Sequence, residues 1–492
     1  AVTTGDGRNT GVGYYAGGSL TTGAYNTALG YQALDTATTG SRNCAFGNYS
    51  LDANTTANDN SAFGYYSLTA NTTGTRNVAI GSYALETNTT GVDNLAVGYE
   101  ALELNTTGQQ NIAVGNYALD ANTTGAYNAA LGMHALGANT EGNSNVSIGW
   151  KSLELNTTGD KNVAVGRDAL GENTTADHNT AIGHNALNLN TTGAENTAVG
   201  GYALDANTTA GNNTAVGYNT LGANTTGAQN TAVGTYALDA NTTANNNTAF
   251  GYAALTANTT GSNGVAVGYN ALGSNTSGLY NVAVGMDALV LNTTANNNVA
   301  VGMRAMFVNT TGANNTGVGF FSLNQNTTGA SNIAVGAYAL DANTTGSYNV
   351  AIGDNALSAN TTADSNTGVG YQSLTTNTTG TDNTAIGRGS LYANNTGDRN
   401  TATGRDALFL NTGSNNTATG HDSLKNNTGN NNTAIGESSL TANTTGTNNV
   451  AVGKNALSAA TTADKNTALG YYAGADITTG VRNTAVGSEA IR

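Results

Sequence analysis

Residues 196–212 read NTAVGGYALDANTTAGN, and this 17-residue stretch is one copy of the repeat that decides the fold. Its glycine, Gly200, belongs to a series that starts at Gly13, continues at Gly30 and ends at Gly487, with 29 members. A repeat of this length is too short for a pair of helices and too long for a coiled-coil heptad. It fits one coil of a parallel β-solenoid, in which each repeat stacks on the one before it.

We number the recurrent asparagine as position 1, so the coil reads N-T-A-V-G-x-x-A-L-x-x-N-T-T-G-x-x. The predicted fold is all-β: a parallel β-solenoid, or β-roll, of about 29 stacked coils that forms an elongated rod. We expect residues 1–492 to form a single continuous solenoid with atypical terminal coils at 1–25 and 471–492. Both terminal coils lose the Leu of position 9 and carry Leu20 or Ile477 in place of Asn at position 12. They are predicted to be caps or, alternatively, complementary ends that stack one rod on another.

Positions 2 to 4 predict a short strand, in which side chains two residues apart share a face. Position 4 is mostly apolar, as in Val97 and Ile182, so we expect positions 2 and 4 to point into the coil. Position 3 is only Ala, Gly or Ser, which predicts that it points outward against a second layer or a neighbouring chain. The single cysteine, Cys44, stands at position 2, where we expect a small buried residue, and one cysteine allows no internal disulfide.

Four further positions are nearly constant and are expected to hold the coils together. Position 5 is always Gly, which indicates a corner with positive φ or no room for a Cβ. Position 9 is nearly always Leu and predicts a continuous apolar spine. Positions 1 and 12 are Asn, and stacked Asn side chains are expected to form two hydrogen-bonded ladders. The first corner glycines are Gly30, Gly47, Gly64, Gly81 and Gly98, and the first ladder asparagines are Asn26, Asn43, Asn60, Asn77 and Asn94 at position 1, and Asn54, Asn71, Asn88, Asn105 and Asn122 at position 12.

Positions 6 and 7 vary freely, are rich in tyrosine and are expected to face solvent. Because aromatic side chains supply rigid contact area, a possible contact stripe for a surface or glycan ligand is formed by Tyr65, Tyr66, Tyr99 and Trp150. The alternative is that these rings only cover the surface. The Asn-Thr-Thr triplets that begin at position 12 match the N-glycosylation pattern, but a buried ladder would exclude a glycan, so we interpret them as structural.

Two coils are one residue short, because the position-1 asparagines run Asn400, Asn416 and Asn432. The deletion falls in the corner that follows position 12. A shortened loop there is expected to leave the strand register unchanged.

Composition argues against several classes of partner. Only 9% of residues are charged and the net charge is −15, which is unfavourable for binding nucleic acid or anionic membranes. There is no proline, as suits a chain that consists of strands and tight corners. We see no apolar run of the roughly 18 residues that span a bilayer, so we expect no membrane insertion. The chain begins Ala-Val-Thr without a visible signal peptide, and we interpret it as a processed protein or a piece of a longer one.

No motif for catalysis, metal binding or cofactor binding emerges from the sequence, and we predict that the chain is not an enzyme. The four histidines stand at variable positions and no acidic cluster with metal-ligand spacing accompanies them; they are His134, His178, His184 and His421. Acidic residues at position 10, such as Asp52 and Asp341, are expected to be isolated. A solenoid enzyme acting on polysaccharide would need long loops that build a groove, and no insertion exceeds the repeat.

The strand and corner resemble the head repeats of trimeric autotransporter adhesins, and also repeats of bacterial and phage tail-fibre-like proteins. The closest matches are residues 77–81 and 349–353, both NVAIG. The resemblance covers nearly the whole chain, although family coils are typically shorter. It implies a left-handed roll, association into a homotrimer, and a location outside the cell, at the cell surface or in a virion fibre.

The predicted function is therefore that of an extracellular structural or adhesive fibre, without enzymatic activity. Self-association as a homotrimer or as an end-to-end filament is expected, with a surface or glycan as a possible ligand. The alternative is an ice-binding solenoid that presents ranks of threonine. The variable occupant of position 2, which is often Val or Ile, argues against an unbroken rank.

Overall fold

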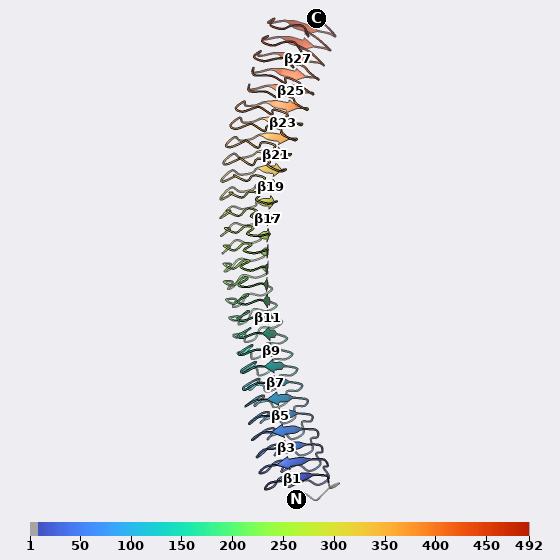
Figure 1. Ribbon diagram of the computed structural model, residues 1–492, viewed down its shortest axis with the longest axis vertical. Helices are drawn as coiled ribbons and strands as arrows, with labels where there is room; N and C mark the ends of the chain where they lie inside the picture. Colours follow the sequence, from blue (N-terminus) through green and yellow to red (C-terminus); the bar gives the residue numbers. More distant parts are fainter. Residues whose placement is uncertain (1–7, 492) are drawn as a thin grey trace. The chain divides into compact units, whose positions relative to one another are not determined.

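The computed structural model describes residues 8–491, and every regular element in that range is a β-strand of three residues. The chain divides into two compact units, residues 1–246 and 247–492. In the described part of each unit the same coil is stacked repeatedly, and every coil contributes one strand (Figure 1). The strands of the first unit are β1 (Thr10–Val12), β2 (Thr27–Leu29), β3 (Cys44–Phe46), β4 (Ser61–Phe63), β5 (Val78–Ile80), β6 (Leu95–Val97), β7 (Ile112–Val114), β8 (Ala129–Leu131), β9 (Val146–Ile148), β10 (Val163–Val165), β11 (Thr180–Ile182), β12 (Thr197–Val199), β13 (Thr214–Val216) and β14 (Thr231–Val233). Those of the second are β15 (Thr248–Phe250), β16 (Val265–Val267), β17 (Val282–Val284), β18 (Val299–Val301), β19 (Thr316–Val318), β20 (Ile333–Val335), β21 (Val350–Ile352), β22 (Thr367–Val369), β23 (Thr384–Ile386), β24 (Thr401–Thr403), β25 (Thr417–Thr419), β26 (Thr433–Ile435), β27 (Val450–Val452), β28 (Thr467–Leu469) and β29 (Thr484–Val486).

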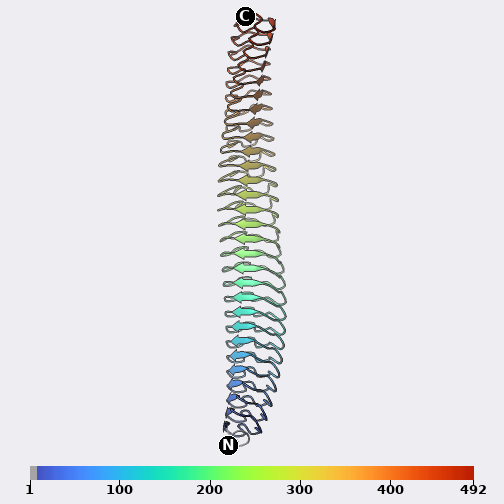
Figure 2. The same ribbon diagram turned by 90° about the vertical axis from the view of Figure 1, so that its right-hand side faces the viewer.

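Within each unit the strands pair in parallel with their sequence neighbours, as the stacked arrows show (Figure 2). In the first unit Thr180 of β11 pairs with Thr197 of β12, and in the second Val265 of β16 pairs with Val282 of β17. Equivalent positions of neighbouring coils therefore lie one above the other. The predicted parallel β-solenoid with a 17-residue coil is confirmed.

The strand side chains face the opposite way from our prediction. Position 3 points inward, and its residues Ala96 and Ala113 are fully buried. Positions 2 and 4 point outward, so that Ile112 is 47% exposed and Ile80 is 42% exposed. Cys44, at position 2, is half-buried on this outward face and is not a core residue. The expectation that the small residues of position 3 face a neighbouring chain is wrong.

The narrow interior of the coil explains why position 3 is small. At Gly317, which replaces Ala at this position, a Cβ would lie 3.1 Å from Ser322 Oγ and 3.3 Å from Met306 Cγ. Ser322 stands at position 8 of the same coil, and Met306 belongs to the position-9 spine of the preceding coil. Position 3 thus packs against the opposite wall, where a branched side chain has no room. The spine itself is confirmed, since its leucines, such as Leu102, are fully buried.

Both predicted asparagine ladders are present and buried, but their hydrogen bonds differ. At position 12 the side chains bond to one another: Asn105 Nδ2 donates to Asn88 Oδ1 at 2.8 Å and to the Gly108 carbonyl at 3.0 Å. At position 1 the side chain accepts from backbone, and the Asn111 N–H donates to Asn94 Oδ1 at 2.9 Å. Because Asn105 is fully buried and its Nδ2 is bonded twice, the folded chain has no room for a glycan there. This supports the structural interpretation of the Asn-Thr-Thr triplets.

The corner glycines are required for two reasons. Gly98 has a φ of +144°, a conformation that residues with a side chain rarely adopt. A Cβ on Gly98 would also lie 2.4 Å from the carbonyl oxygen of Gly115 in the next coil. The same two conditions hold at Gly30, Gly47, Gly64 and Gly81, so the predicted corner is confirmed.

Three other positions of the coil have a left-handed backbone without being glycine. In one coil these are Glu100 at position 7, Leu102 at position 9 and Gln110 at position 17, with φ of +54°, +53° and +56°. Positions 7 and 17 hold no Val, Ile or Thr in any coil. This fits the steric cost of a β-branched side chain at positive φ.

The short coils and the terminal coils follow the same plan. Between the two short coils Thr401 pairs with Thr417, so the deletion leaves the strand register unchanged, as predicted. Leu20 is buried and Ile477 is half-buried, and Gly17 and Gly474 take the left-handed conformation of position 9. Whether these coils are caps or complementary ends stays a prediction, and residues 1–7 and 492 lie outside the described range.

Candidate functional site

The outward side chains of positions 2 and 4 form an apolar surface in each unit, which we call the strand face. In all 29 strands these positions hold no charged residue and no side-chain amide. Parallel sheets are usually covered on both faces, and a contiguous exposed apolar patch marks an interaction site. Large apolar side chains at least 37% exposed on this face include Leu29, Phe63, Ile80, Ile112, Leu131, Ile148 and Ile182 in the first unit, and Phe250, Val267, Ile333, Ile352, Ile386, Ile435, Val450 and Leu469 in the second.

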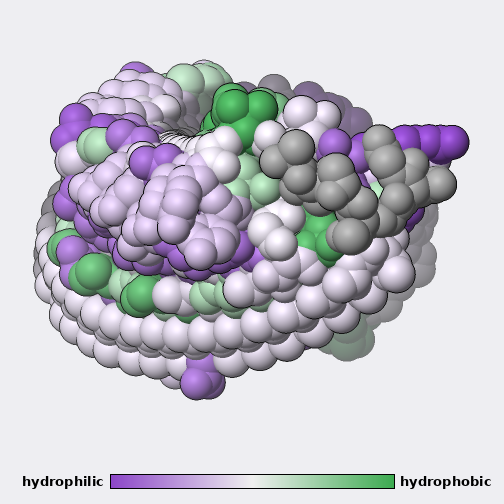
Figure 3. All heavy atoms as spheres, turned by 90° about the horizontal axis from the view of Figure 1, so that it is seen from below, coloured by the Kyte–Doolittle hydropathy of each residue, from purple (hydrophilic) through white to green (hydrophobic). Residues whose placement is uncertain are grey.

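Seen from one end, the surface is mostly of intermediate hydropathy (Figure 3). The end view in Figure 3 is largely pale, which marks residues of intermediate hydropathy, with separate green and purple areas. Within residues 8–491 no helix is long and apolar enough to cross a membrane. Local groups of side chains at positions 6, 7 and 10 are further candidates for recognition outside the strand face.

The structure brings three of the four predicted contact residues into one ring stack. Tyr65 and Tyr66 contact at 4.5 Å between ring centroids, and Tyr83 connects them to Tyr99, whose ring is 6.0 Å away. Tyr65 and Tyr99 are 42% and 40% exposed, while Tyr66 is half-buried. A hydrogen bond with Glu100, followed by burial, raises the pKa of Tyr99 to about 12. The phenol of Tyr99 is therefore a neutral donor and acceptor at physiological pH.

Trp150 lies in a different setting from the tyrosine stack. Its ring contacts the guanidinium of Arg167 at 4.8 Å and the amine of Lys151 at 5.1 Å from the centroid. Cation–π contacts of this kind hold the indole in place. The predicted stripe is thus two separate features, a tyrosine stack and a tryptophan between two cations.

The acidic residues at position 10 are not all isolated, contrary to our expectation. Burial raises the pKa of Glu103, and the neighbouring carboxylates of Glu100, Glu86 and Asp120 raise it further. In the second unit burial raises the pKa of Asp341 to about 6. Stacking at a fixed period places these like charges one coil apart, which the linear sequence does not display.

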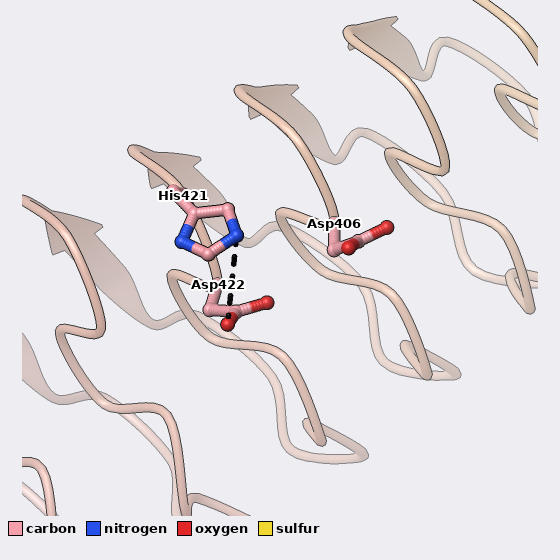
Figure 4. A group of neighbouring side chains, drawn as sticks. All are labelled: Asp406, His421 and Asp422. Atoms are coloured by element: carbon pink, nitrogen blue, oxygen red, sulfur yellow. Dashed lines mark ion pairs between the residues drawn. The ribbon is translucent and has the colours of Figure 1, made fainter.

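One histidine has acidic neighbours that sequence reasoning missed. His421, Asp406 and Asp422 offer ligand atoms that all lie within 4.8 Å of one another, on two adjacent coils (Figure 4). His421 Nε2 is 3.7 Å from Asp422 Oδ2. The signal was the 16-residue spacing of Asp406 and Asp422, which places both at position 7 of successive short coils.

The carboxylates of this group already have cationic partners. Arg405 Nε lies 3.2 Å from Asp406 Oδ2, and Lys425 Nζ lies 2.9 Å from Asp422 Oδ1. A divalent ion would have to displace both contacts, so the arrangement is first a network of ion pairs. It also lies next to a hollow in the surface, at Gly389.

Comparison with known proteins adds no relative. No model of a protein family matches the chain, and no curated protein matches it. The functional argument therefore depends on the geometry described above.

Proposed function

We propose that the chain is a non-enzymatic extracellular fibre, structural and adhesive, whose coils associate with further copies of the chain through the strand face. The observation that supports this is the strand face itself: it is free of charge in every described coil, partly exposed, and carries an apolar residue at position 4 in every strand except β24 and β25. The resemblance to trimeric autotransporter heads favours a homotrimer at a cell surface or in a virion fibre.

A further copy of this chain is the partner that best fits the repeat of the face. Ile148 and Val165 are paired in register, so their side chains form a row with one residue per coil. Strands of a sheet are spaced by about 4.8 Å, and only a partner with the same axial spacing keeps contact in every coil. A second copy has this spacing along each unit, whereas an unrelated globular surface would match only a few coils.

Light scattering on the purified chain tests the proposal. We expect the mass of three chains of 49.1 kDa each for the unmodified protein. Ile80→Asp with Ile112→Asp places two charges on the strand face and is expected to reduce the mass toward one chain. The control, Gln109→Asp with Gln110→Asp, adds the same charges at exposed positions off the strand face and is expected to keep the assembly.

Two results would contradict the proposal. One is a single-chain mass for the unmodified protein at all concentrations tested. The other is an assembly that survives the strand-face charges. Very large, heterogeneous species that persist in the strand-face variant would indicate end-to-end assembly through the terminal coils instead.

A second candidate function, ice binding, is favoured by one observation. Threonines at position 2 are consecutive in β11–β14 and in β22–β26, and they lie on the outward strand face. β24 and β25 carry Thr at position 4 as well, which forms a small array of two ranks. A thermal hysteresis assay separates the two functions, since an ice-binding face must work as a bare surface and a covered interface gives no hysteresis.

A further inference from the structure

We propose that a hollow at Gly389 in the second unit is a subsite for an acidic sugar, a hexose ring that bears a carboxylate. The inference deepens the adhesive part of the proposed function and rests on it for its biological purpose. The hollow lies beyond the glycine corner from the strand face, among residues of positions 6, 7 and 10. Self-association and sugar binding can therefore be tested apart.

The hollow borders a position that has no side chain, Gly389. Gly389 is the only glycine at position 7 among the described coils, and it keeps the left-handed φ of that position, +65°. A Cβ there would lie 2.5 Å from Asp406 Oδ1 and 3.5 Å from the ring of Phe409. Beside Gly389 lies a cavity of about 310 Å³, lined also by Gln372, Arg388, Tyr392, Asp406, Phe409 and Lys425. This volume is within the range of small-ligand sites.

Aromatic rings form one wall of the hollow. Tyr392 and Phe409 stand at position 10 of successive coils and stack with centroids 5.0 Å apart and planes 10° from parallel. No other two successive coils carry aromatic residues at position 10. Aromatic walls with a few fixed polar groups are typical of sites that bind small ligands with a partly apolar surface, such as the C–H side of a sugar ring.

The polar groups around the wall fit a carboxylate and hydroxyls. Arg388 forms no ion pair with any described residue, so its guanidinium is available for a bidentate contact with a carboxylate. Asp406 is held by Arg405 through Oδ2, its Oδ1 lies against Gly389, and as a lining residue its carboxylate offers acceptors for a hydroxyl group. Gln372 adds a donor and an acceptor on the other side.

The same groups disfavour other anions. A phosphate or sulfate would bring two or more negative oxygens against the carboxyl oxygens of Asp406, which are acceptors. One sugar ring that bears a carboxylate has hydroxyl donors for Asp406 and a single charged group for Arg388. Neutral sugars leave the guanidinium without a partner.

The test is calorimetric titration of the full chain with trigalacturonic acid, with neutral galactotriose and inorganic phosphate as comparison ligands. We expect saturable binding of trigalacturonic acid and at least tenfold weaker binding of both comparison ligands. Gly389→Asn fills the hollow and is expected to weaken binding at least tenfold. The fold tolerates Asn at position 7 next to Asp406 at position 7 of the following coil. The same combination already occurs at Asn270 and Asp287, where Asn270 Nδ2 donates to Asp287 Oδ1 at 3.2 Å.

Two more variants make the result specific. Arg388→Gln removes the proposed carboxylate partner and is expected to reduce trigalacturonic acid binding at least tenfold. Arg399→Gln makes the same charge change at position 17, away from the hollow, and is expected to leave binding unchanged. Hydrogen exchange of each variant verifies that the coils remain folded.

Several outcomes would overturn the inference. They are no binding of trigalacturonic acid, equal binding of galactotriose, tighter binding of phosphate, or unchanged binding in Gly389→Asn. Light scattering on the same samples separates the two proposals. A single-chain mass with intact sugar binding refutes self-association alone, and a trimer without sugar binding refutes the subsite alone.

Discussion

Replacing one asparagine inside the position-12 ladder is the most direct test of what holds the coils together. Asn105 is fully buried in the first unit and donates from Nδ2 to Asn88 Oδ1 and to the Gly108 carbonyl. Its own Oδ1 accepts from Asn122 Nδ2 at 2.8 Å. Asn105→Ala therefore deprives Asn88 Oδ1 of its ladder donor and one N–H of Asn122 of its acceptor. The Gly108 carbonyl keeps its bond from Asn94 Nδ2 at 2.9 Å.

The expected cost follows from these two orphaned groups. A buried polar group left without a partner costs about 1–3 kcal/mol, so the substitution should destabilise the local stack by about 4 kcal/mol. Solenoids open coil by coil, and a single unfolding midpoint would hide the effect. The measurement is native-state hydrogen exchange of the full chain, read on peptides that cover residues 88–122. At about 1.4 kcal/mol per tenfold change, exchange there should accelerate several hundred-fold.

The end of the ladder provides the matched control. Asn54 is the first rung, with an amide bond of 3.3 Å to the Ala57 carbonyl and a 3.3 Å bond from Asn71. Asn54→Ala orphans one ladder group, and its effect on its own coils should be about half as large in free energy. Equal effects of the two substitutions would refute the reasoning, as would less than a tenfold acceleration for Asn105→Ala.

Three further predictions concern the corner, the interior and pH. Gly98→Ala should destabilise its coil by at least about 3 kcal/mol, measured as a local loss of hydrogen-exchange protection. The reason is that residue 98 has a positive φ and that the new Cβ would clash with the backbone of Gly115. Ala96→Val should cost about 1–3 kcal/mol in the same assay through overpacking, and unchanged protection would contradict the inward direction of position 3. The raised pKa of Asp341, about 6 when folded, means that its proton is bound more tightly in the folded state. Its contribution to stability is therefore present at pH 4 and lost as pH rises through 6. Asp341→Asn should flatten this pH dependence, measured between pH 4 and pH 7 as hydrogen-exchange protection factors of its coil.

Features that depend on one residue type repeated at one period were predictable from the sequence. Gly at position 5, Leu at position 9 and Asn at positions 1 and 12 each contact their own equivalents in the next coil, so the linear pattern carries the contact directly. Asn105 and Asn88 are 17 residues apart, one coil, and bond to each other. The corner glycines are constrained by the backbone of the next glycine in the same way.

The inside and outside of the strand were not predictable from alternation alone. A three-residue strand has one side chain on one face and two on the other. A small residue at position 3 between larger residues at positions 2 and 4 is compatible with position 3 pointing either inward or outward. What decides is the opposite wall, where the Leu spine already fills the interior and leaves room for a methyl group only. The contact of Gly317 with Met306 and Ser322 shows this directly. A restricted position 3 was a valid signal of close packing, but the close neighbour is the same chain.

The local site was hidden for a different reason. The hollow at Gly389 depends on side chains from three other coils, so its residues are scattered between positions 372 and 425 of the linear chain. Aligning the coils by position would have revealed the one glycine in a column of larger residues. The absence of β-branched residues from positions 7 and 17 was a second signal, since it reports a left-handed backbone there.

The positions that are fixed by contacts between coils and the positions that vary lie on different surfaces. A function that repeats in every coil and a function confined to one site can therefore use different parts of the coil. The two short coils keep both ladders: the Asn416 N–H donates to Asn400 Oδ1 at 2.9 Å, and Asn427 Nδ2 donates to Asn411 Oδ1 at 2.9 Å. The strand register and the ladders are therefore kept through the short coils, whereas the corner tolerates the loss of a residue. Positions 6, 7 and 10 differ from coil to coil and can build a single site such as the hollow at Gly389. The strand face is uncharged and in register in every coil, so a contact made there can repeat with the coil, which is the property that a partner with the same repeat would use.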